Sequence, residues 1–529
     1  MSLLFVLLAL HATDTGVGWL PARLDLDLTL WPDREEIELD AMLRLRLDLD
    51  RSSGPTILLN AANANMKLER VLPPPGATVT IDQDGARAEL RFAQPCTRGE
   101  LVELRLIARS RRAQSFQFQV SEQITLASWT EAWYPHPAAS DADSSRALRA
   151  PGTTTIAMPR GWRSIANGTL IDTFEDGERL TESWECEAAV ARSFAAGPFH
   201  VAHAQLGDRT IGAFLLTASS ESAERQALQL TRALEAMERR FGRYPYASYA
   251  IVEVPTARVA WGASSEQGFV MANSLSFAGG SGSLPLFAHE MAHGWWGNLV
   301  TGSGPGAILL SESLAQYGAV VAIEAIEGEA AATEFLRFSR SGYVLDQCAR
   351  GYFEIVRRKQ DVPLAQLLSG GVHHTLADAK GHWVYHMLRQ RIGDELFFST
   401  LRRIILEFRE RPLTLAELRR SFIQAAPPAA QLELFFAQWL DRTGAPVLDV
   451  HWSKADADLV EVELAFADQP YDLTVELAVE DAGPQRLHRL ALHDRTARVT
   501  LPATGAVRSV RLDPHHRLLV WQPEYGPRP

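Results

Sequence analysis

Two histidines flank a glutamate in the middle of this 529-residue chain, as His289, Glu290 and His293. On a helix, His289 and His293 lie one turn apart on the same face, so both imidazoles can reach one point. Zinc binds imidazole nitrogen and carboxylate oxygen, and catalytic zinc sites combine three protein ligands with an exchangeable water. Glu312, separated from His293 by eighteen residues, can supply the third ligand from a second helix. The spacing therefore predicts a site for one Zn²⁺ ion, held by His289, His293 and Glu312.

Glu290 directly follows the first predicted ligand. A carboxylate at this position can take a proton from a zinc-bound water, so Glu290 is the predicted general base of a zinc hydrolase. The alternative is an exposed helix that carries two histidines by chance. The apolar flanks, with Trp295 and Trp296, argue against an exposed helix.

The composition is that of a globular protein with several domains. Apolar residues make up 46% and charged residues 22% of the chain, and its length is enough to bury a large core. The net charge of −12 and the absence of basic runs exclude nucleic acid as the expected partner. Three widely spaced cysteines, expected to be buried thiols, cannot form a disulfide framework.

The N-terminus holds the most membrane-like stretch of the sequence, an apolar run at residues 3–10. It is too short to span a bilayer, so no spanning segment is expected. Its length is that of the apolar part of a signal peptide, although no Lys or Arg precedes it. Residues 1–14 therefore indicate either an export signal, for a periplasmic or secreted protein, or an apolar N-terminal segment of a cytoplasmic one.

Hydrophobic periodicity divides the remaining chain into three parts. Residues 15–205 alternate in short stretches and predict an antiparallel β-sandwich. Residues 206–445 begin with a helix near residue 221 and a strand at 249–255, carry the zinc motif, and continue with helical spacing, including a run over 383–408. Residues 446–529 return to strand patterns and predict a small β-sandwich. The expected fold class is multidomain α+β.

Several further segments resemble one known family. They are Phe-Gly-Arg-Tyr-Pro-Tyr at 241–246, Val-Glu-Val-Pro at 252–255, Trp-Gly-Asn-Leu-Val-Thr at 296–301, Lys-Gly at 380–381, Ile-Gly-Asp-Glu at 392–395 and Val-Arg-Leu-Asp-Pro at 510–514. With the zinc motif, they are similar to the zinc aminopeptidases of peptidase family M1, the gluzincins that include aminopeptidase N and leukotriene hydrolase. The resemblance implies a thermolysin-like mixed α/β catalytic domain with a helical second half, zinc as the cofactor and peptides as substrates. The large helical C-terminal domain of many members is not expected here.

One departure from the family concerns the binding of a substrate's free amino group. Family members use the Glu of a Gly-x-Met-Glu-Asn loop, and the corresponding segment here begins at Gly262 and places Ser265 at the Glu position and Glu266 at the Asn position. Neighbouring residues of an extended segment point opposite ways, so Glu266 serves as the amine anchor only if the loop bulges. The alternative is a solvated loop carboxylate. Glu131 loosely resembles a second amine-binding position, or is a plain carboxylate at a strand edge.

A second departure concerns stabilisation of the oxyanion. The family places a Tyr two residues before the Lys-Gly pair, and that position is Asp378 here. An ionised carboxylate would repel the oxyanion, and loss of one such donor typically costs about two to three orders of magnitude in turnover. His374, or its neighbour His373, could donate instead. Further candidates are Tyr343, Tyr352 and Tyr385.

The leading hypothesis is a zinc exopeptidase that removes N-terminal residues from peptides. The changes at Ser265 and Asp378 leave two alternatives. One is a metal-bound, weakly active or silent peptide-binding protein on a peptidase scaffold. The other is a zinc hydrolase whose specificity is not for free N-termini. The sequence carries no signature of side-chain preference or oligomeric state.

Overall fold

The computed structural model places most of the chain. The described residues are 18–59, 65–112, 115, 117–140, 144–217, 219–255, 262–277, 284–339, 347–409, 411–456 and 458–529. They belong to two compact units, one made of residues up to 227 with 246–280, the other of 228–245 with 281–529. The predicted signal or apolar segment 1–14 lies outside the described residues, so export stays a prediction.

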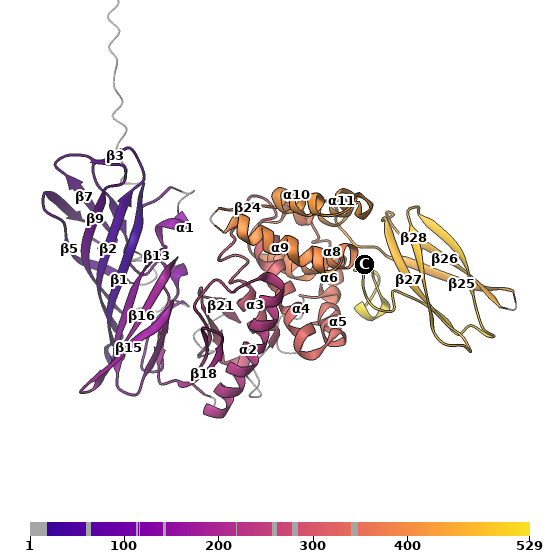
Figure 1. The fold of residues 1–529 in the computed structure, drawn as a ribbon, viewed down its shortest axis with the longest axis horizontal. Coiled ribbons are helices and arrows are strands. Elements are labelled where there is room, and N and C mark those ends of the chain that lie inside the picture. The colour runs from indigo at the N-terminus through magenta and orange to yellow at the C-terminus, as the bar shows by residue number, and fades with distance from the viewer. Residues whose placement is uncertain are drawn as a thin grey trace, which may run out of the picture. The chain divides into compact units, whose positions relative to one another are not determined.

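Alternating apolar residues build the large sheet of the first unit (Figure 1). On its strand β1, Leu24, Leu26, Leu28 and Leu30 are all buried, while the residues between them are more exposed. The seven strands in spatial order are β15 (Thr169–Asp176), β16 (Arg179–Val190), β13 (Ala150–Pro159), β1 (Trp19–Trp31), β2 (Glu36–Leu47), β9 (Leu101–Arg111) and β5 (Met66–Leu72). One pair departs from the predicted antiparallel pattern, because β1 and β13 run parallel. Parallel neighbours need a long connection, and here residues 32–149 lie between the two strands in the chain.

Smaller sheets complete this β-rich part. One contains β10 (Phe118–Val120), β11 (Thr125–Ala127), β17 (Phe194–Gly197) and β14 (Arg163–Ala166). A second contains β12 (His136–Pro137), β4 (Thr56–Leu58), β7 (Arg87–Phe92) and β6 (Ala77–Ile81), and β3 (Arg51–Ser52) pairs with β8 (Cys96–Thr97). Buried side chains from these sheets and from the seven-stranded sheet share one hydrophobic core.

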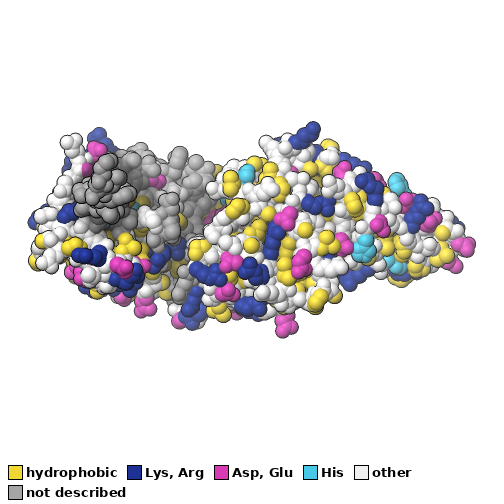
Figure 2. Space-filling view, turned by 90° about the horizontal axis from the view of Figure 1, so that it is seen from above, with side chains coloured by type: hydrophobic (Ala, Val, Ile, Leu, Met, Phe, Trp, Pro, Cys, Tyr) yellow, Lys and Arg dark blue, Asp and Glu magenta, His cyan; other side chains and the backbone are white. Residues whose placement is uncertain are grey.

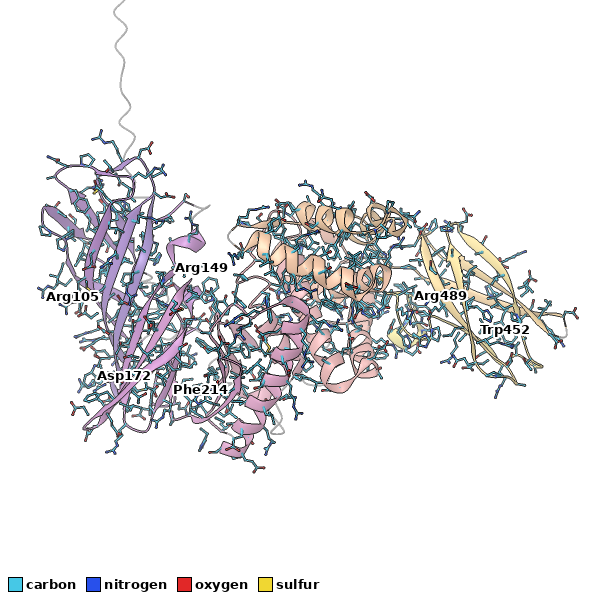
Figure 3. The ribbon with its side chains drawn as sticks, viewed as in Figure 1. Arg105, Arg149, Asp172, Phe214, Trp452 and Arg489 are labelled. Atoms are coloured by element: carbon cyan, nitrogen blue, oxygen red, sulfur yellow. The ribbon has the colours of Figure 1, made fainter. Side chains whose placement is uncertain are left out.

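A mixed five-stranded sheet follows within the same unit. Its strands in spatial order are β18 (His200–Leu206), β19 (Arg209–Leu215), β20 (Ser248–Val254), β22 (Phe269–Asn273) and β21 (Ala263–Ser265). β20 runs parallel to both its neighbours, whereas β18 and β21 are antiparallel edge strands. Phe214 packs from β19 with its ring edge-on to Phe199, 5.9 Å between centroids (Figure 3). The segment aligned with the amine-binding loop of the family thus lies on β21 and the turn after it.

The second unit is mainly helical, as predicted. Its helices include the C-terminal part of α2 (Ser220–Phe241), followed by α3 (Leu284–Ala292), α4 (Leu314–Glu327), α5 (Glu329–Phe338), α6 (Ala349–Arg357), α7 (Gly371–Leu376), α8 (His382–Ile392), α9 (Asp394–Phe408), α10 (Leu415–Ala425) and α11 (Leu432–Leu440). Two short strands, β23 (Gly302–Ser303) and β24 (Leu413–Thr414), pair in parallel, and a short helix of the first unit, α1, covers Ser144–Ala147. The predicted helical run over 383–408 is two helices, because Gly393, at φ 83°, takes a left-handed conformation that ends α8.

Helix α3, which carries the zinc motif, is buried along its whole length. Trp295 follows it, lies edge-on to the ring of Tyr244 at 5.0 Å between centroids, and donates its indole N–H to the carbonyl of Arg243 at 3.2 Å. Gly318 lets α4 approach α3 closely, since a Cβ there would lie 2.4 Å from the Cβ of Ala292. These contacts fix the helix that bears the histidines against the helix that follows Glu312.

Two three-stranded sheets close the second unit as a small β-sandwich. They are β25 (Leu448–Asp456), β26 (Leu459–Phe466) and β29 (Thr496–Pro502), and β28 (Arg486–Leu492), β27 (Leu473–Glu480) and β30 (Ser509–Leu512). Each sheet buries apolar side chains, among them Val462 on β26 and Leu477 on β27. Arg489 on β28 ion-pairs with Glu476 on β27, with 3.1 Å between nitrogen and oxygen (Figure 3). The predicted multidomain α+β class, with β-rich ends and a mixed, then helical, middle part, is confirmed, while the boundaries at 205 and 445 stay predictions.

The surface carries charges of both signs. Acidic and basic side chains are interspersed over the face shown in Figure 2. Within the described residues, one helical stretch, Leu309–Glu327, has the length and composition of a membrane span, and most of it is buried inside the protein. It includes Glu312, so its apolar character fits a core helix beside a polar site.

Candidate metal centre

The histidines of the motif converge as their spacing predicts. His289 lies in the last turn of α3, and the backbone N–H of His293 donates to the carbonyl of His289 at 3.2 Å, continuing the helical turn. The two Nε2 atoms are 3.1 Å apart, with the ring planes nearly perpendicular at 83°. Both imidazoles therefore direct the same nitrogen toward one point.

Glu312 completes a set of three donor atoms. Its Oε2 lies 3.5 Å from Nε2 of His289 and 3.6 Å from Nε2 of His293. Zinc with ligands at about 2.0–2.1 Å in tetrahedral geometry has neighbouring donor atoms about 3.3–3.4 Å apart. The three donor atoms fit that spacing, and two imidazoles with one carboxylate are a ligand set that zinc takes in catalytic sites.

The other ring nitrogen of each histidine is held by an acceptor. Nδ1 of His289 lies 2.9 Å from Oε1 of Gln316, and Nδ1 of His293 lies 2.9 Å from the carbonyl oxygen of Trp296. A proton on Nδ1 donated to these oxygens leaves the lone pair of Nε2 for a metal. Sequence reasoning missed Gln316, although it follows Glu312 by four residues and so shares its helical face.

The charges in this cluster favour a cation between the ligands. Burial lowers the pKa of His293, but the Glu312 carboxylate outweighs burial and raises that pKa to about 10. Burial raises the pKa of Glu312, yet attraction to His293 outweighs it and holds the pKa well below its usual range. Protons supply the positive charge in the absence of metal, and a divalent ion would replace them on neutral imidazoles.

Glu290, the predicted base, lies on α3 beside the first ligand. Its side chain is buried, with only 7% of the residue exposed. Burial raises the pKa of its carboxyl group above the ordinary value. A raised pKa makes the carboxylate a stronger proton acceptor, which suits a general base.

Glu312 lies on a π-helical turn, Leu309–Ser313, that leads into α4. We name it the Glu312 turn. A second π-helical turn, Ala377–Gly381, lies between α7 and α8 and carries Asp378; we name it the Asp378 turn. Ser313 joins the two by donating its hydroxyl to the carbonyl of Ala377 at 2.6 Å. π-Helical turns are rare and occur frequently at functional sites.

Asp378, aligned with the family's oxyanion Tyr, is fully buried. Its Oδ2 accepts a hydrogen bond from Nε2 of Gln347 at 2.6 Å and lies 3.1 Å from Nε2 of His374. Nε2 of His374 is also 3.8 Å from Oε2 of Glu312. The structure thus brings Asp378 and His374 together beside the third ligand, and Gln347 is a further residue that the sequence did not indicate.

The other predicted oxyanion donors are engaged elsewhere or are not described. Nδ1 of His373 accepts from the backbone N–H of Leu368 at 2.9 Å. The hydroxyl of Tyr352 donates to Asp361 at 2.8 Å, and that of Tyr385 donates to the carbonyl of Leu309 at 3.0 Å. Tyr343 lies outside the described residues. Among the predicted alternatives that the structure describes, His374 is the one whose ring nitrogen lies beside Glu312.

Glu266 and Glu131 belong to the first unit, where they lie close to one short turn. Glu266 is fully buried, and its carboxylate accepts hydrogen bonds from the hydroxyls of Ser128, Ser193 and Ser264 at 2.7 to 3.1 Å. Ser128 caps the turn Trp129–Glu131, whose last residue, Glu131, accepts from the hydroxyl of Ser115 at 2.8 Å. The alternative of a solvated loop carboxylate at Glu266 is wrong, since its side chain is fully buried and accepts hydrogen bonds from these serines.

Comparisons with known proteins agree with this geometry. Residues 227–439 match the model of the peptidase family M1 domain. Aminopeptidase N of Lactococcus lactis subsp. lactis is 26% identical over 308 residues, which are 56% of this chain and 35% of that protein. The chain thus spans about a third of the length of this curated relative.

Solved structures share the fold. An M1 zinc metallopeptidase from Deinococcus radiodurans matches with a TM-score of 0.58 at 19% identity, covering 80% of this chain and 94% of that one. A mutant from the same organism, bound to a Tyr-Ser-Ala substrate, matches with a TM-score of 0.57 at 19% identity, covering 80% of this chain and 94% of that one. A two-domain M1 zinc metallopeptidase mutant bound to L-arginine matches with a TM-score of 0.59 at 19% identity, covering 81% of this chain and 95% of that one. Residues 227–439 therefore match a peptidase family M1 domain, and the chain is similar to a curated aminopeptidase N and to solved M1 metallopeptidases.

Proposed function

We propose that the protein is a zinc-dependent metallopeptidase that removes N-terminal residues from peptides. The observation that carries the proposal is the convergence of His289, His293 and Glu312 at the spacing of a tetrahedral zinc site, with Glu290 next to the first ligand. Bound zinc supplies a water of lowered pKa and a Lewis acid for the peptide carbonyl. The family supports zinc as the metal, and the resident ligands fit it.

Glu290 is the proton carrier in this proposal. Its carboxylate takes a proton from the attacking water and returns it to the amine that leaves when the peptide bond breaks. Burial supports this role, because it raises the pKa of Glu290. Gln316 and the Trp296 carbonyl keep the ligating nitrogens aimed at the ion.

Recognition of a free N-terminus is assigned to Glu266 and Glu131. Glu266 lies one residue after the position that aligns with the family's amine-binding Glu, and its carboxylate accepts hydrogen bonds from serine hydroxyls. Ser265, which aligns with the family's amine-binding Glu, is partly exposed on β21 and brings no charge. Glu266 and Glu131 are therefore proposed as amine partners on the resemblance to the family.

The test compares an aminoacyl-arylamide with its N-acetylated form, using zinc-loaded full-length protein. The free form is expected to be cleaved and the acetylated form to be cleaved at least about a hundredfold more slowly, because the acetyl group removes the charge that Glu266 and Glu131 bind. Equal rates would favour a zinc hydrolase without a requirement for a free N-terminus. Absence of hydrolysis of every arylamide and peptide offered would overturn the peptidase proposal.

A second candidate function is a metal-bound peptide-binding protein with slow or no turnover. The observation that favours it is Asp378, a buried carboxylate at the position that aligns with a hydrogen-bond donor in the family. Robust wild-type turnover that disappears in Glu290→Gln would exclude this candidate. Peptide binding with no turnover in either protein would support it.

A further inference from the structure

A second set of metal-binding atoms lies next to the first and shares Glu312 with it. Nε2 of His374 lies 3.8 Å from Oε2 of Glu312 and 3.1 Å from Oδ2 of Asp378. The three donor atoms all lie within 4.8 Å of one another. One imidazole nitrogen and two carboxylate oxygens thus gather beside the primary site, at a somewhat wider spacing than its three donor atoms.

Asp378 is built into this set by the fold. It is fully buried on the Asp378 turn, and Gln347 holds its Oδ2 with a hydrogen bond of 2.6 Å. Its other oxygen, Oδ1, is also buried and has no hydrogen-bond partner among the described residues. A buried carboxylate is costly unless charge or hydrogen bonds compensate it, so the Asp378 side chain, with one oxygen near His374 and the other unpartnered, would be stabilised by a bound cation.

The charges of the whole cluster point the same way. Glu290, Glu312 and Asp378 are three buried or half-buried carboxylates on neighbouring elements. A proton on Nε2 can be donated well to one carboxylate at a time, whereas a metal ion binds Glu312, His374 and Asp378 together.

We propose that Glu312, His374 and Asp378 hold a second divalent cation, with Glu312 bridging it to the primary site. A set of one imidazole and two carboxylates suits a borderline divalent ion such as Zn²⁺ or Mn²⁺. Two-metal sites with shared ligands occur in aminopeptidases and stabilise both oxygens of a displacement. Asp378 occupies the position that aligns with the family's Tyr. A cation bound there would stabilise the oxyanion by its positive charge, in place of the missing Tyr hydroxyl. The inference rests on the proposed function for its catalytic meaning, but not for the site itself.

Metal counting tests the site without any assay of activity. Full-length protein is saturated with Zn²⁺ alone, freed of excess ion by gel filtration, and measured by elemental analysis. Wild type is expected to hold two equivalents, and Asp378→Asn and His374→Ala one each. His373→Ala is the matched control, because His373 neighbours His374 but binds the Leu368 N–H instead, and it should retain two equivalents.

Two results would overturn the second site. Wild type that holds one equivalent would mean that the charge between these atoms is a proton on His374, whose contact with Asp378 raises the pKa to about 9. Two equivalents that persist in both Asp378→Asn and His374→Ala would place the second ion elsewhere. Failure of the proposed function looks different: wild type then holds two equivalents of zinc, one of which is lost in each variant, but it hydrolyses no arylamide or peptide.

Discussion

The hydroxyl of Ser313 donates to the carbonyl of Ala377 at 2.6 Å, and this bond joins the two π-helical turns that carry Glu312 and Asp378. The turns touch so closely that a Cβ on Gly381 would lie 2.1 Å from the Ser313 hydroxyl oxygen. A π-turn widens the helix and directs the side chain of its acidic residue differently from a regular turn. This buried hydrogen bond is thus one of the contacts that position the two site carboxylates.

Weakening this contact should weaken the metal centre. Ser313→Ala strands a buried carbonyl and should cost about 1–3 kcal/mol of stability. Gly381→Ala should cost more, because its methyl group meets the hydroxyl. The double variant should lose less stability than the sum of the losses in the two single variants, since removing the Ser313 hydroxyl relieves the closest clash. Thermal unfolding and zinc titration measure this, and strictly additive losses would show that the turns are not coupled here.

Gln316 should control the affinity of the primary site through His289. Gln316→Leu removes the acceptor of the Nδ1 proton, so zinc affinity should fall about 10- to 100-fold. Gln316→Glu keeps an acceptor oxygen and should bind zinc at least as tightly as wild type. Competition against a chelator measures both variants. Equal losses in the two would mean that packing, rather than the hydrogen bond, fixes His289.

Glu290→Gln should separate metal binding from turnover. The variant keeps the shape of the side chain and all three zinc ligands, so its zinc content should match wild type. Turnover should fall by about 10² to 10⁴, the contribution of a general base. Steady-state rates with the free arylamide measure the loss. Activity within threefold of wild type would mean that another group carries the proton.

The start of α10 offers a pH-dependent test of stability. Thr414 and Glu417 form a capping box, and hydrogen bonds, first that from Arg411, lower the pKa of Glu417 from 4.5 to about 2. Because the pKa of Glu417 is lower in the folded protein, its ionised form stabilises the fold at pH values above 4.5. This stabilisation is lost as the pH falls from 4.5 through 2. Glu417→Gln should therefore loosen α10 at pH 7, by about 1 kcal/mol, and match wild type near pH 2. Hydrogen exchange over α10 reports this, and a difference that is constant with pH would contradict it.

The sequence alone predicted those parts of the site whose residues lie close together in the chain. His289, Glu290 and His293 lie within two helical turns, so helix periodicity alone placed both imidazoles on one face. The β-rich ends and the helical middle followed from alternation and helical spacing, because each strand or helix buries one face. The parallel pairing of β1 with β13 had no such signal, since it joins residues more than a hundred positions apart.

The rest of the site depends on contacts between distant residues. The two π-turns are joined by residues 64 positions apart, and no hydrophobic pattern marks a π-turn. Glu266 is turned inward by Ser128 and Ser193, which precede it by 138 and 73 residues. Asp378 could be aligned with the family's Tyr, but its partner Gln347 could not be inferred. Such polar partners are chosen by tertiary geometry rather than by local pattern.

The central claim is that His289, His293 and Glu312 bind one zinc ion between them. Crystals of the zinc-loaded protein, measured at the zinc absorption edge, test it most directly. An anomalous peak is expected about 2.0–2.1 Å from both Nε2 atoms and from a carboxylate oxygen of Glu312. A crystal with no peak at these atoms, or with its zinc bound only at other residues, would contradict it.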